Sequence, residues 1–218
     1  MSFDPITNAG VKALQGQVNT VQTKLAQIEN TQAALRKPLR VTEYTSGAGT
    51  HSILPDSNHQ HILLIGAGGG GGYGFRNYSN GYTYWGSGGG AGDELHRRAG
   101  FKGSVAYQVG AGSMGKGGST RLGHLWVDGG AVGLNAFVDN NGAPTPMSTR
   151  QGNGISAGSQ GNTISGGDSM LGKGGINSTP LAGLASGYGA GGGGTCGHVS
   201  NSTTPSPGTG GYIRIEEY

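Results

Sequence analysis

The chain has 218 residues, 49 of them glycine, and only 11% are charged, with a formal net charge of +3. The low charge excludes a highly charged disordered chain, and the glycines lack the period of a collagen repeat. A broad basic face for nucleic acid is excluded as well, because Lys and Arg are scattered and their densest cluster is residues 96–98. With one cysteine, no signal peptide and no long apolar run, we expect a soluble protein without internal disulfides, made in the cytoplasm and not inserted into a membrane.

A heptad pattern is the first regular feature of the chain. Residues 1–10 have no periodicity and predict an irregular lead-in, and Pro38 ends the pattern near Lys37. β-Branched residues at the d positions favour a trimer over a dimer, and the alternative is a helix docked on its own domain. We predict a parallel trimeric coiled coil over residues 11–37. Its a positions are Val11, Val18, Leu25 and Gln32, and its d positions are Leu14, Val21, Ile28 and Leu35.

Strand signals predict a β-domain over residues 39–218. The apolar run 62–65 is typical of a strand buried on both faces. The alternating residues 212–217 predict a terminal strand that pairs in the centre of a sheet. Further strands are expected at 39–45, 50–55, 91–99, 104–109 and 119–127. The fold class is therefore mainly β with an N-terminal helix.

Glycine blocks follow the strand at 62–65 and recur at 88–90 and 191–194. Glycine brings no side chain to a core, so we expect part of the interior to be main chain. From residue 142 to residue 208 the strand signals nearly vanish, which predicts either a disordered insertion or several polyproline II segments side by side. Such segments would satisfy their peptide groups by bonding to one another.

An aromatic loop at residues 73–85 holds six of the fifteen aromatic side chains. Its mixture of Tyr, Ser, Gly and Asn is typical of binding loops. A β-hairpin that turns at Asn80–Gly81 and covers the domain with its rings is the alternative, and both interpretations can hold. The candidate receptor contacts are Arg76, Tyr78, Tyr82, Tyr84 and Trp85.

Catalytic signatures are weak. The eleven carboxylates are dispersed along the chain, and the glycines at 66–72 lack the following helix that a dinucleotide site requires. We therefore expect no enzymatic activity and no cofactor. His59 and His61 offer one metal hypothesis: on a trimer axis, three such pairs would supply six imidazoles to iron, nickel or zinc. The alternative is two histidines that flank the start of a strand.

Six short blocks occur in a characteristic order. They are Ser-Gly-Ala-Gly-Thr at 46–50, Ile-Leu-Leu-Ile-Gly-Ala and five glycines at 62–72, Gly-Gly-Gly-Ala-Gly at 88–92, Tyr-Gln-Val-Gly-Ala-Gly at 107–112, Gly-Gly-Ser-Thr at 117–120, and Gly-Gly-Tyr-Ile-Arg-Ile at 210–215. Over residues 42–218 this order resembles the glycine-rich domain at the ends of bacteriophage tail fibres. It is also similar to the glycine-rich domain of anaplastic lymphoma kinase. The resemblance implies a jelly-roll-like β-sandwich with an inserted bundle of polyglycine II helices.

The same resemblance implies a function. The chain would be a homotrimeric adhesin in a virion, at the tip of a tail fibre or spike, and would recognise a glycan or outer-membrane protein on the host cell surface. Its N-terminus would attach it to another virion protein. The alternative is a purely structural virion component, such as a shaft adaptor, a vertex protein or an assembly protein.

Overall fold

The computed structural model describes residues 5–35, 37–76, 83–84, 86–135, 165–176, 181–195 and 204–218. It contains two compact units, a helical one within residues 1–39 and a larger one, Arg40–Glu217. The larger unit is mainly β and its sheets are antiparallel. The expected fold class, mainly β with an N-terminal helix, is confirmed at this level.

Helix α1 (Pro5–Leu35) has 31 residues and begins earlier than the heptads alone predict. Part of the expected irregular lead-in is helical because proline is favourable in the first turn, where its missing N–H would have no partner. The heptad side chains form an exposed stripe, with exposed fractions between 47% and 64% for the six that are described. The side chains of Gln32 and Leu35 lie outside the described set. The six are Val11, Leu14, Val18, Val21, Leu25 and Ile28.

The first sheet has the strand order β1-β12-β3-β6. Its strands are β1 (Arg40–Tyr44), β12 (Tyr212–Glu217), β3 (Gln60–Ile65) and β6 (Glu94–Ala99). The C-terminal strand lies between β1 and β3, as its alternating sequence predicts, and Ile215 stands opposite Ile62. The charged strand β6 occupies an edge, where polar side chains discourage pairing with another chain.

The second sheet has the order β2-β7-β8-β9. Its strands are β2 (Ala48–Ser52), β7 (Ser104–Gln108), β8 (Thr120–Leu122) and β9 (Leu125–Val127). Side chains from both sheets form one apolar core, so the two sheets pack face to face. The buried members of this core are Ile53, Ile62, Leu64, Val105, Val109, Leu122, Leu125, Val127, Ile213 and Ile215.

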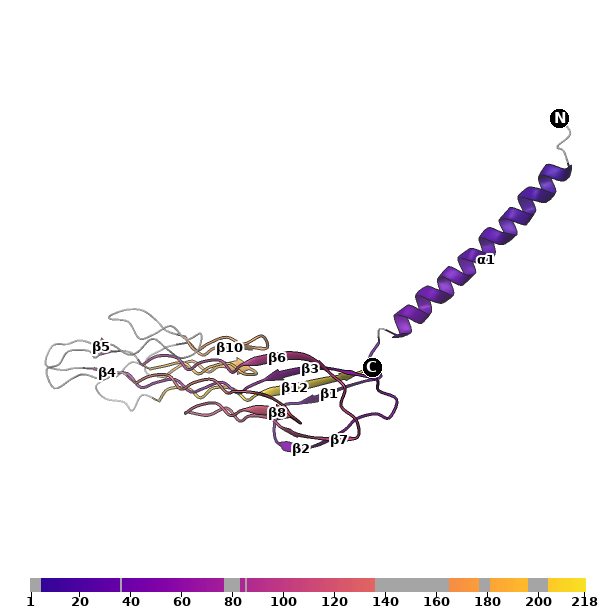
Figure 1. The fold of residues 1–218 in the computed structure, drawn as a ribbon. Helices are drawn as coiled ribbons and strands as arrows, with labels where there is room; N and C mark the ends of the chain where they lie inside the picture. Colours follow the sequence, from indigo (N-terminus) through magenta and orange to yellow (C-terminus); the bar gives the residue numbers. More distant parts are fainter. Residues whose placement is uncertain are drawn as a thin grey trace. The chain divides into compact units, whose positions relative to one another are not determined.

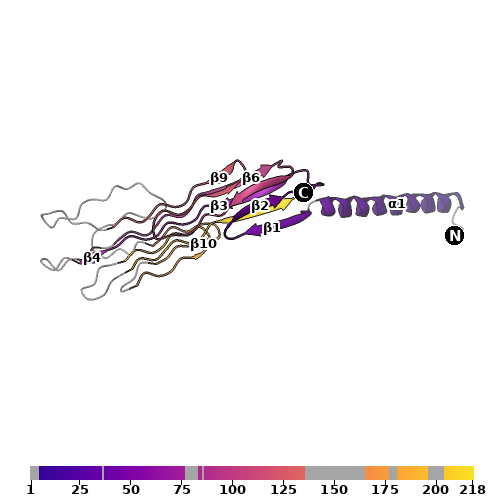
Figure 2. The ribbon, with the colours of Figure 1, turned by 90° about the horizontal axis from the view of Figure 1, so that it is seen from below.

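Two short ribbons complete the described strands. β4 (Phe75–Arg76) pairs with β5 (Thr83–Tyr84), and β10 (Gly172–Lys173) pairs with β11 (Ser186–Gly187). Between the two large sheets and the β4–β5 ribbon, extended segments of the chain run side by side (Figures 1 and 2). We call these extended segments the glycine bundle. The β4–β5 ribbon therefore lies at the end of the bundle that is remote from the sheets.

A three-residue hydrogen-bond period organises the glycine bundle. The central segment, residues 66–72, donates its backbone N–H groups to three neighbouring segments in rotation, at N···O distances of 2.7–3.0 Å. To the first neighbouring segment, Gly66, Gly69 and Gly72 donate to the carbonyls of Asp93, Gly90 and Ser87, respectively. To the second, Ala67 and Gly70 donate to Gly118 and Gly115, and to the third, Gly68 and Gly71 donate to Thr209 and Ser206. Three residues per turn is the repeat of a polyproline II helix. The bundle thus satisfies its peptide groups without a side-chain core.

At many of its glycines, the segments of the bundle lie too close together for a side chain. A Cβ atom placed on Gly68 would lie 1.9 Å from the carbonyl oxygen of Ala190, and one on Gly71 would lie 2.0 Å from that of Gly193. These distances are far below van der Waals contact, so glycine is required here. The expectation that part of the interior is main chain is confirmed. The neighbours at 190–195 and 206–208 belong to the region 142–208 with few strand signals, of which residues 142–164, 177–180 and 196–203 lie outside the described set.

Candidate functional site

The predicted receptor contacts fall on and around the β4–β5 ribbon. In its register, Phe75 stands opposite Tyr84, and Arg76 stands opposite Thr83. This antiparallel pairing makes the aromatic loop a β-hairpin at its base. The backbones of Arg76 and Tyr84 are therefore held in one ribbon at the remote end of the bundle (Figures 1 and 2). The side chains of these two residues lie outside the described set, as do Tyr78, Tyr82 and Trp85 in full.

The bundle supports both ends of this hairpin by accepting hydrogen bonds from backbone N–H groups. The N–H of Tyr73 donates to Oδ1 of Asn135 over 2.8 Å, and the N–H of Gly86, just beyond the hairpin, donates to the carbonyl of Thr195 over 2.9 Å. The Tyr73 side chain is 50% exposed. Chain segments distant in sequence thus hold both ends of the hairpin in place.

A buried polar network at the opposite end of the domain was not foreseen from the sequence. The Glu217 side chain is fully buried, and its Oε2 accepts a 2.7 Å hydrogen bond from the N–H of Leu54. Its Oε1 accepts a 2.8 Å bond from Nε of Arg40 and lies 3.0 Å from Nε2 of His51. On the other side of the imidazole, Nδ1 lies 2.8 Å from the hydroxyl of Tyr44. The network ties β1 and β12 of the first sheet to β2 of the second.

The environment of Glu217 explains how a buried carboxylate is tolerated. Burial alone raises its pKa, but the hydrogen bonds from Leu54, Arg40 and His51 and the charge of Arg40 outweigh this effect and hold the pKa below its ordinary value. The sequence does carry a signal for this site, because Glu217 is in phase with Ile213 and Ile215 on the buried face of β12. The network joins two sheets, and Glu217 and His51 at its centre are buried, so we assign it a structural role.

The histidine pair lies at the start of β3. The rings of His59 and His61 are tilted against each other with centroids 5.4 Å apart. Burial, the charge of Arg98 and the proximity of His61 together lower the pKa of His59. Within the described ranges, no group of three or more His, Cys, Asp or Glu side chains could hold a metal ion. One chain brings together two imidazoles, so the metal site on a trimer axis stays a prediction.

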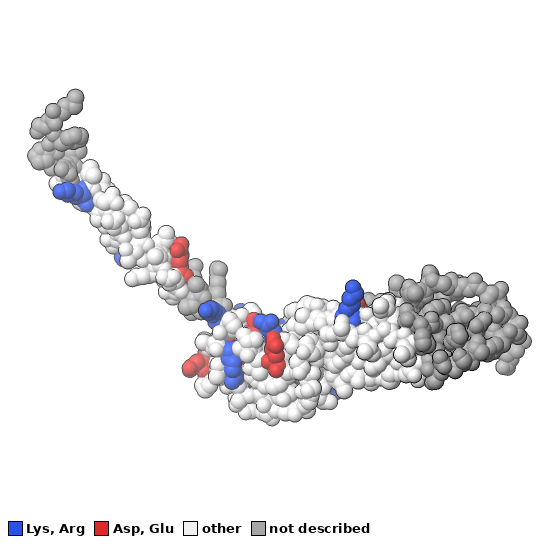
Figure 3. Space-filling model, turned by 180° about the vertical axis from the view of Figure 1, so that it is seen from behind, with Lys and Arg blue, Asp and Glu red and all other residues white. Residues whose placement is uncertain are grey.

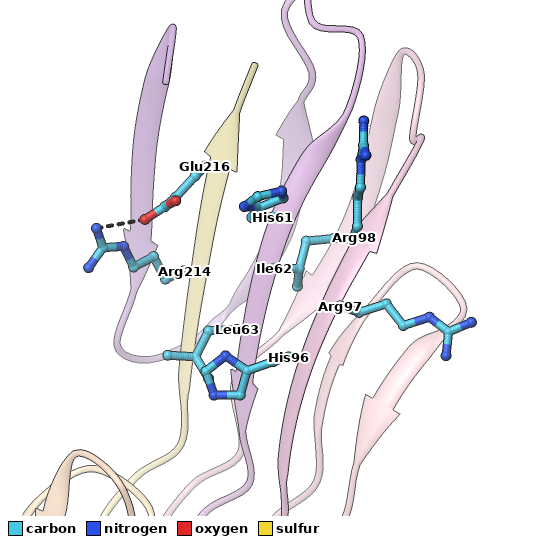
Figure 4. A pocket seen from close by; sticks show the side chains of 8 residues that line it. All are labelled: His61, Ile62, Leu63, His96, Arg97, Arg98, Arg214 and Glu216. Atoms are coloured by element: carbon cyan, nitrogen blue, oxygen red, sulfur yellow. Dashed lines mark ion pairs between the residues drawn. The ribbon is translucent and has the colours of Figure 1, made fainter. Parts of the chain in front are cut away.

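A shallow pocket lies on the outer face of the first sheet, with a volume of about 480 Å³. It arises from cross-strand register: His61 stands opposite Glu216 on one side and Arg98 on the other. In the next row of this face, Leu63 stands opposite Arg214 and His96. Figure 4 shows these side chains projecting from β12, β3 and β6 around the pocket. Sequence reasoning noted residues 96–98 as the densest basic cluster but could not place His61 beside them.

Charge on this pocket is unevenly distributed. On the β12 side, Nη2 of Arg214 lies 2.7 Å from Oε1 of Glu216, and Nη1 lies 4.0 Å from Oε1 of Glu43. On the β6 side, the described residues provide no ion pair for Arg98. On the face of the Arg40–Glu217 unit drawn in Figure 3, most charged side chains gather at the sheet end, and the described part of the glycine bundle is mostly uncharged. The printed ion pairs of this pocket therefore lie on its β12 side.

Comparisons with known proteins assign no family to this chain. No protein-family model matches it, and no curated protein matches it. The described residues include no helix that is both long and apolar enough to cross a bilayer.

Proposed function

We propose that this chain is a receptor-binding tail-fibre or spike protein of a bacteriophage, which recognises a glycan or outer-membrane protein on the bacterial surface. One observation carries the proposal: a bundle packed through its main chain extends from a two-sheet domain and holds an aromatic-rich hairpin at its remote end. The block order of the sequence adds the resemblance to tail-fibre domains. We interpret the two sheets as a jelly-roll-like sandwich and the bundle as polyglycine II helices.

The architecture suits adhesion because a bundle whose segments are joined by main-chain hydrogen bonds is stiff. Each peptide of its central segment donates to a neighbouring segment, and glycines confined in this way have lost their usual freedom. A stiff support holds a short loop in one position and reduces the entropy lost when that loop binds. The aromatic rings would stack on sugars or fill protein pockets, while Arg76 would add directional hydrogen bonds.

We further propose that α1 assembles three copies into a parallel coiled coil. Its exposed apolar stripe is the support for this assembly, because isolated helices in water seldom leave such a seam uncovered. Two further copies of the same chain would cover this stripe, because the heptad spacing favours pairing of the helix with copies of itself. Three receptor sites on one fibre would raise the apparent affinity by a factor on the order of 10²–10⁴. The N-terminal end of the coiled coil would connect the trimer to another virion protein.

The test uses the full chain with Tyr84→Ala and Trp85→Ala together. We expect the variant to keep a solution mass of about three times 21.8 kDa in light scattering but to lose adsorption to host cells. Trp126→Ala is the control, since Trp126 is an aromatic side chain, 58% exposed, on β9 of the second sheet. It should adsorb like the unmodified chain.

Two results would contradict parts of this proposal. Unchanged adsorption of the double variant would remove the aromatic loop from receptor binding. A trimer that adsorbs to no host cell, with or without the substitutions, would instead indicate a purely structural virion component. A mass equal to one chain would exclude the coiled-coil trimer.

A further inference from the structure

A short ribbon covers part of the outer face of the first sheet. Ile65 on β3 and Tyr212 on β12 stand opposite each other and belong to this face, because the next residues along their strands lie in the core between the sheets. Both are nonetheless buried. The ring of Tyr188, which follows β11, stacks on the ring of Tyr212 with centroids 4.9 Å apart. We call residues 168–176 and 181–189, which contain β10 and β11, the ribbon cover.

The side of the ribbon cover that faces away from the sheet is apolar. Its other side contacts the sheet, where the N–H of Met170 donates to Oε1 of Glu94 on β6, so the exposed side chains of the cover point away from the sheet. Asp168 and Lys173 are the charged residues of the cover. A group of exposed apolar side chains marks a surface that contacts a partner. Five belong to this group, with exposed fractions of 40–77%: Met170, Leu171, Ile176, Leu181 and Leu184.

The rest of the outer face carries charges of both signs. Glu216 on β12 pairs with Arg214 over 2.7 Å, and Glu43 on β1 lies 4.0 Å from the same guanidinium. Arg98 and Glu94 add one charge of each sign on β6. The arginines and carboxylates of this face therefore nearly cancel. A second copy of the same face would meet no strong repulsion, which like charges would otherwise cause.

The covalent chain indicates which partner reaches this face. Helix α1 ends at Leu35 and β1 begins at Arg40, and these five residue steps span at most about 18 Å even when fully extended. Val41 on β1 is 43% exposed and stands opposite Glu216 on the same outer face. This step rests on the coiled-coil trimer proposed above, which tethers the starts of three β1 strands at an effective concentration on the order of millimolar. A neighbouring copy of the chain is therefore the nearest partner for this face.

We propose that the outer side of the first sheet, from Val41 to the ribbon cover, packs against a neighbouring copy of this chain within the trimer. The apolar side chains of the cover are buried in this contact, and the balanced charges of the sheet lie around them. An apolar centre with a polar rim is the usual anatomy of a protein interface. The contact holds the three glycine bundles at a fixed spacing, which is the condition for three hairpins to engage a surface together.

The test measures how fast an introduced thiol reacts with a maleimide in the full chain. Cys196→Ser removes the one native cysteine, and Leu184→Cys places a thiol at the most exposed apolar position of the cover, 77% exposed in a single copy. We expect this thiol to react at least about tenfold more slowly in the trimer than in a monomer, because the contact must open first. Leu14→Asp with Leu25→Asp supplies the monomer, since charges in the heptad stripe separate the helices. Light scattering verifies the mass of each sample.

Ser104→Cys is the matched control, because Ser104 is exposed on β7 of the second sheet. Its thiol should react equally fast in the trimer and in the monomer. A trimer in which the thiol of Leu184→Cys reacts as fast as in the monomer would overturn the contact and leave the coiled coil intact. A mass of one chain with the helix unsubstituted would overturn both. Protection that appears only after phosphatidylethanolamine vesicles are added would assign the cover to a membrane and overturn the contact as well. No cells are used, so the result is independent of receptor binding.

Discussion

The unit Arg40–Glu217 contains two interiors built on different principles. Between the sheets, fully buried side chains such as Leu64 and Ile213 form a conventional apolar core. In the glycine bundle, peptide groups bond to one another, and the space next to Gly68 is filled by a carbonyl oxygen. Apolar side chains fill the first interior. In the second, the main-chain segments lie so close together that positions such as Gly68 have no room for a side chain.

This difference has energetic consequences. An apolar core gains about 25 cal/mol per Å² of buried apolar surface, and it accepts exchanges that keep its volume. The bundle gains little from apolar burial and pays the high conformational entropy of glycine. Its stability therefore depends on complete hydrogen bonding and close approach of the segments. We expect the bundle to be intolerant of a single added methyl group and the core to be tolerant of reshaping.

The largest effect is expected for Gly68→Ala. The new Cβ would lie 1.9 Å from the carbonyl oxygen of Ala190, so backbone segments must separate and lose their hydrogen bonds. We expect a loss of about 4 kcal/mol or more in the free energy of unfolding, measured by denaturant titration.

The control for this substitution is Gly100→Ala, because a Cβ at Gly100 would have no atom within 4 Å. It should change the free energy of unfolding by less than about 0.5 kcal/mol. If Gly68→Ala were as mild as Gly100→Ala, the close packing of the bundle would be refuted.

A smaller loss is expected in the side-chain core. Leu64→Ala removes fully buried atoms at the centre of the first sheet and should cost about 3 kcal/mol. Leu64→Met keeps the volume and should cost less than about 1.5 kcal/mol. The same denaturant titration measures both variants. Similar losses for Ala and Met would mean that the core, like the bundle, tolerates no change of shape.

The smallest effect is expected in the polar network of Glu217. Glu217→Gln removes the charge that pairs with Arg40 and should cost about 2 kcal/mol at neutral pH. Because the pKa of Glu217 is lowered in the folded state, its carboxylate stabilises the fold above the unfolded pKa of about 4.3. That contribution is lost as the pH falls through the folded pKa.

The pH dependence of stability tests whether the substitution at Glu217 acts through its charge. The difference in urea midpoint between the unmodified chain and Glu217→Gln should be largest at pH 7 and should shrink as the pH falls below about 4. A difference that is constant across this range would mean that the substitution acts through shape and not through charge.

Local patterns predicted many elements of this molecule. Alternation of Tyr, Ile and Arg at 212–217 predicted a strand that pairs in the centre of a sheet. The heptads predicted the helix, although it begins earlier than they do, at Pro5. The candidate sites were harder to predict from local patterns. Glu217 was in phase with buried isoleucines, but its partners Arg40 and His51 lie 177 and 166 residues away in the chain. His61 and Arg98 face each other only through the pairing of β3 with β6.

Periodicity is a local property, since the spacing of apolar residues and the positions of proline and glycine act within a few residues of the chain. The amino-acid order was therefore sufficient for the helix, the strands of the two large sheets and the need for a main-chain interior, but not for the short strands β10 and β11. It was not sufficient to pair the segments of that interior. Gly68 donates a hydrogen bond to Thr209 and packs on Ala190. Glycine, however, has no side chain whose chemistry could indicate in the sequence which segment it will pack against. The three-dimensional packing alone selects those neighbours, because only there do distant peptide groups come within bonding distance.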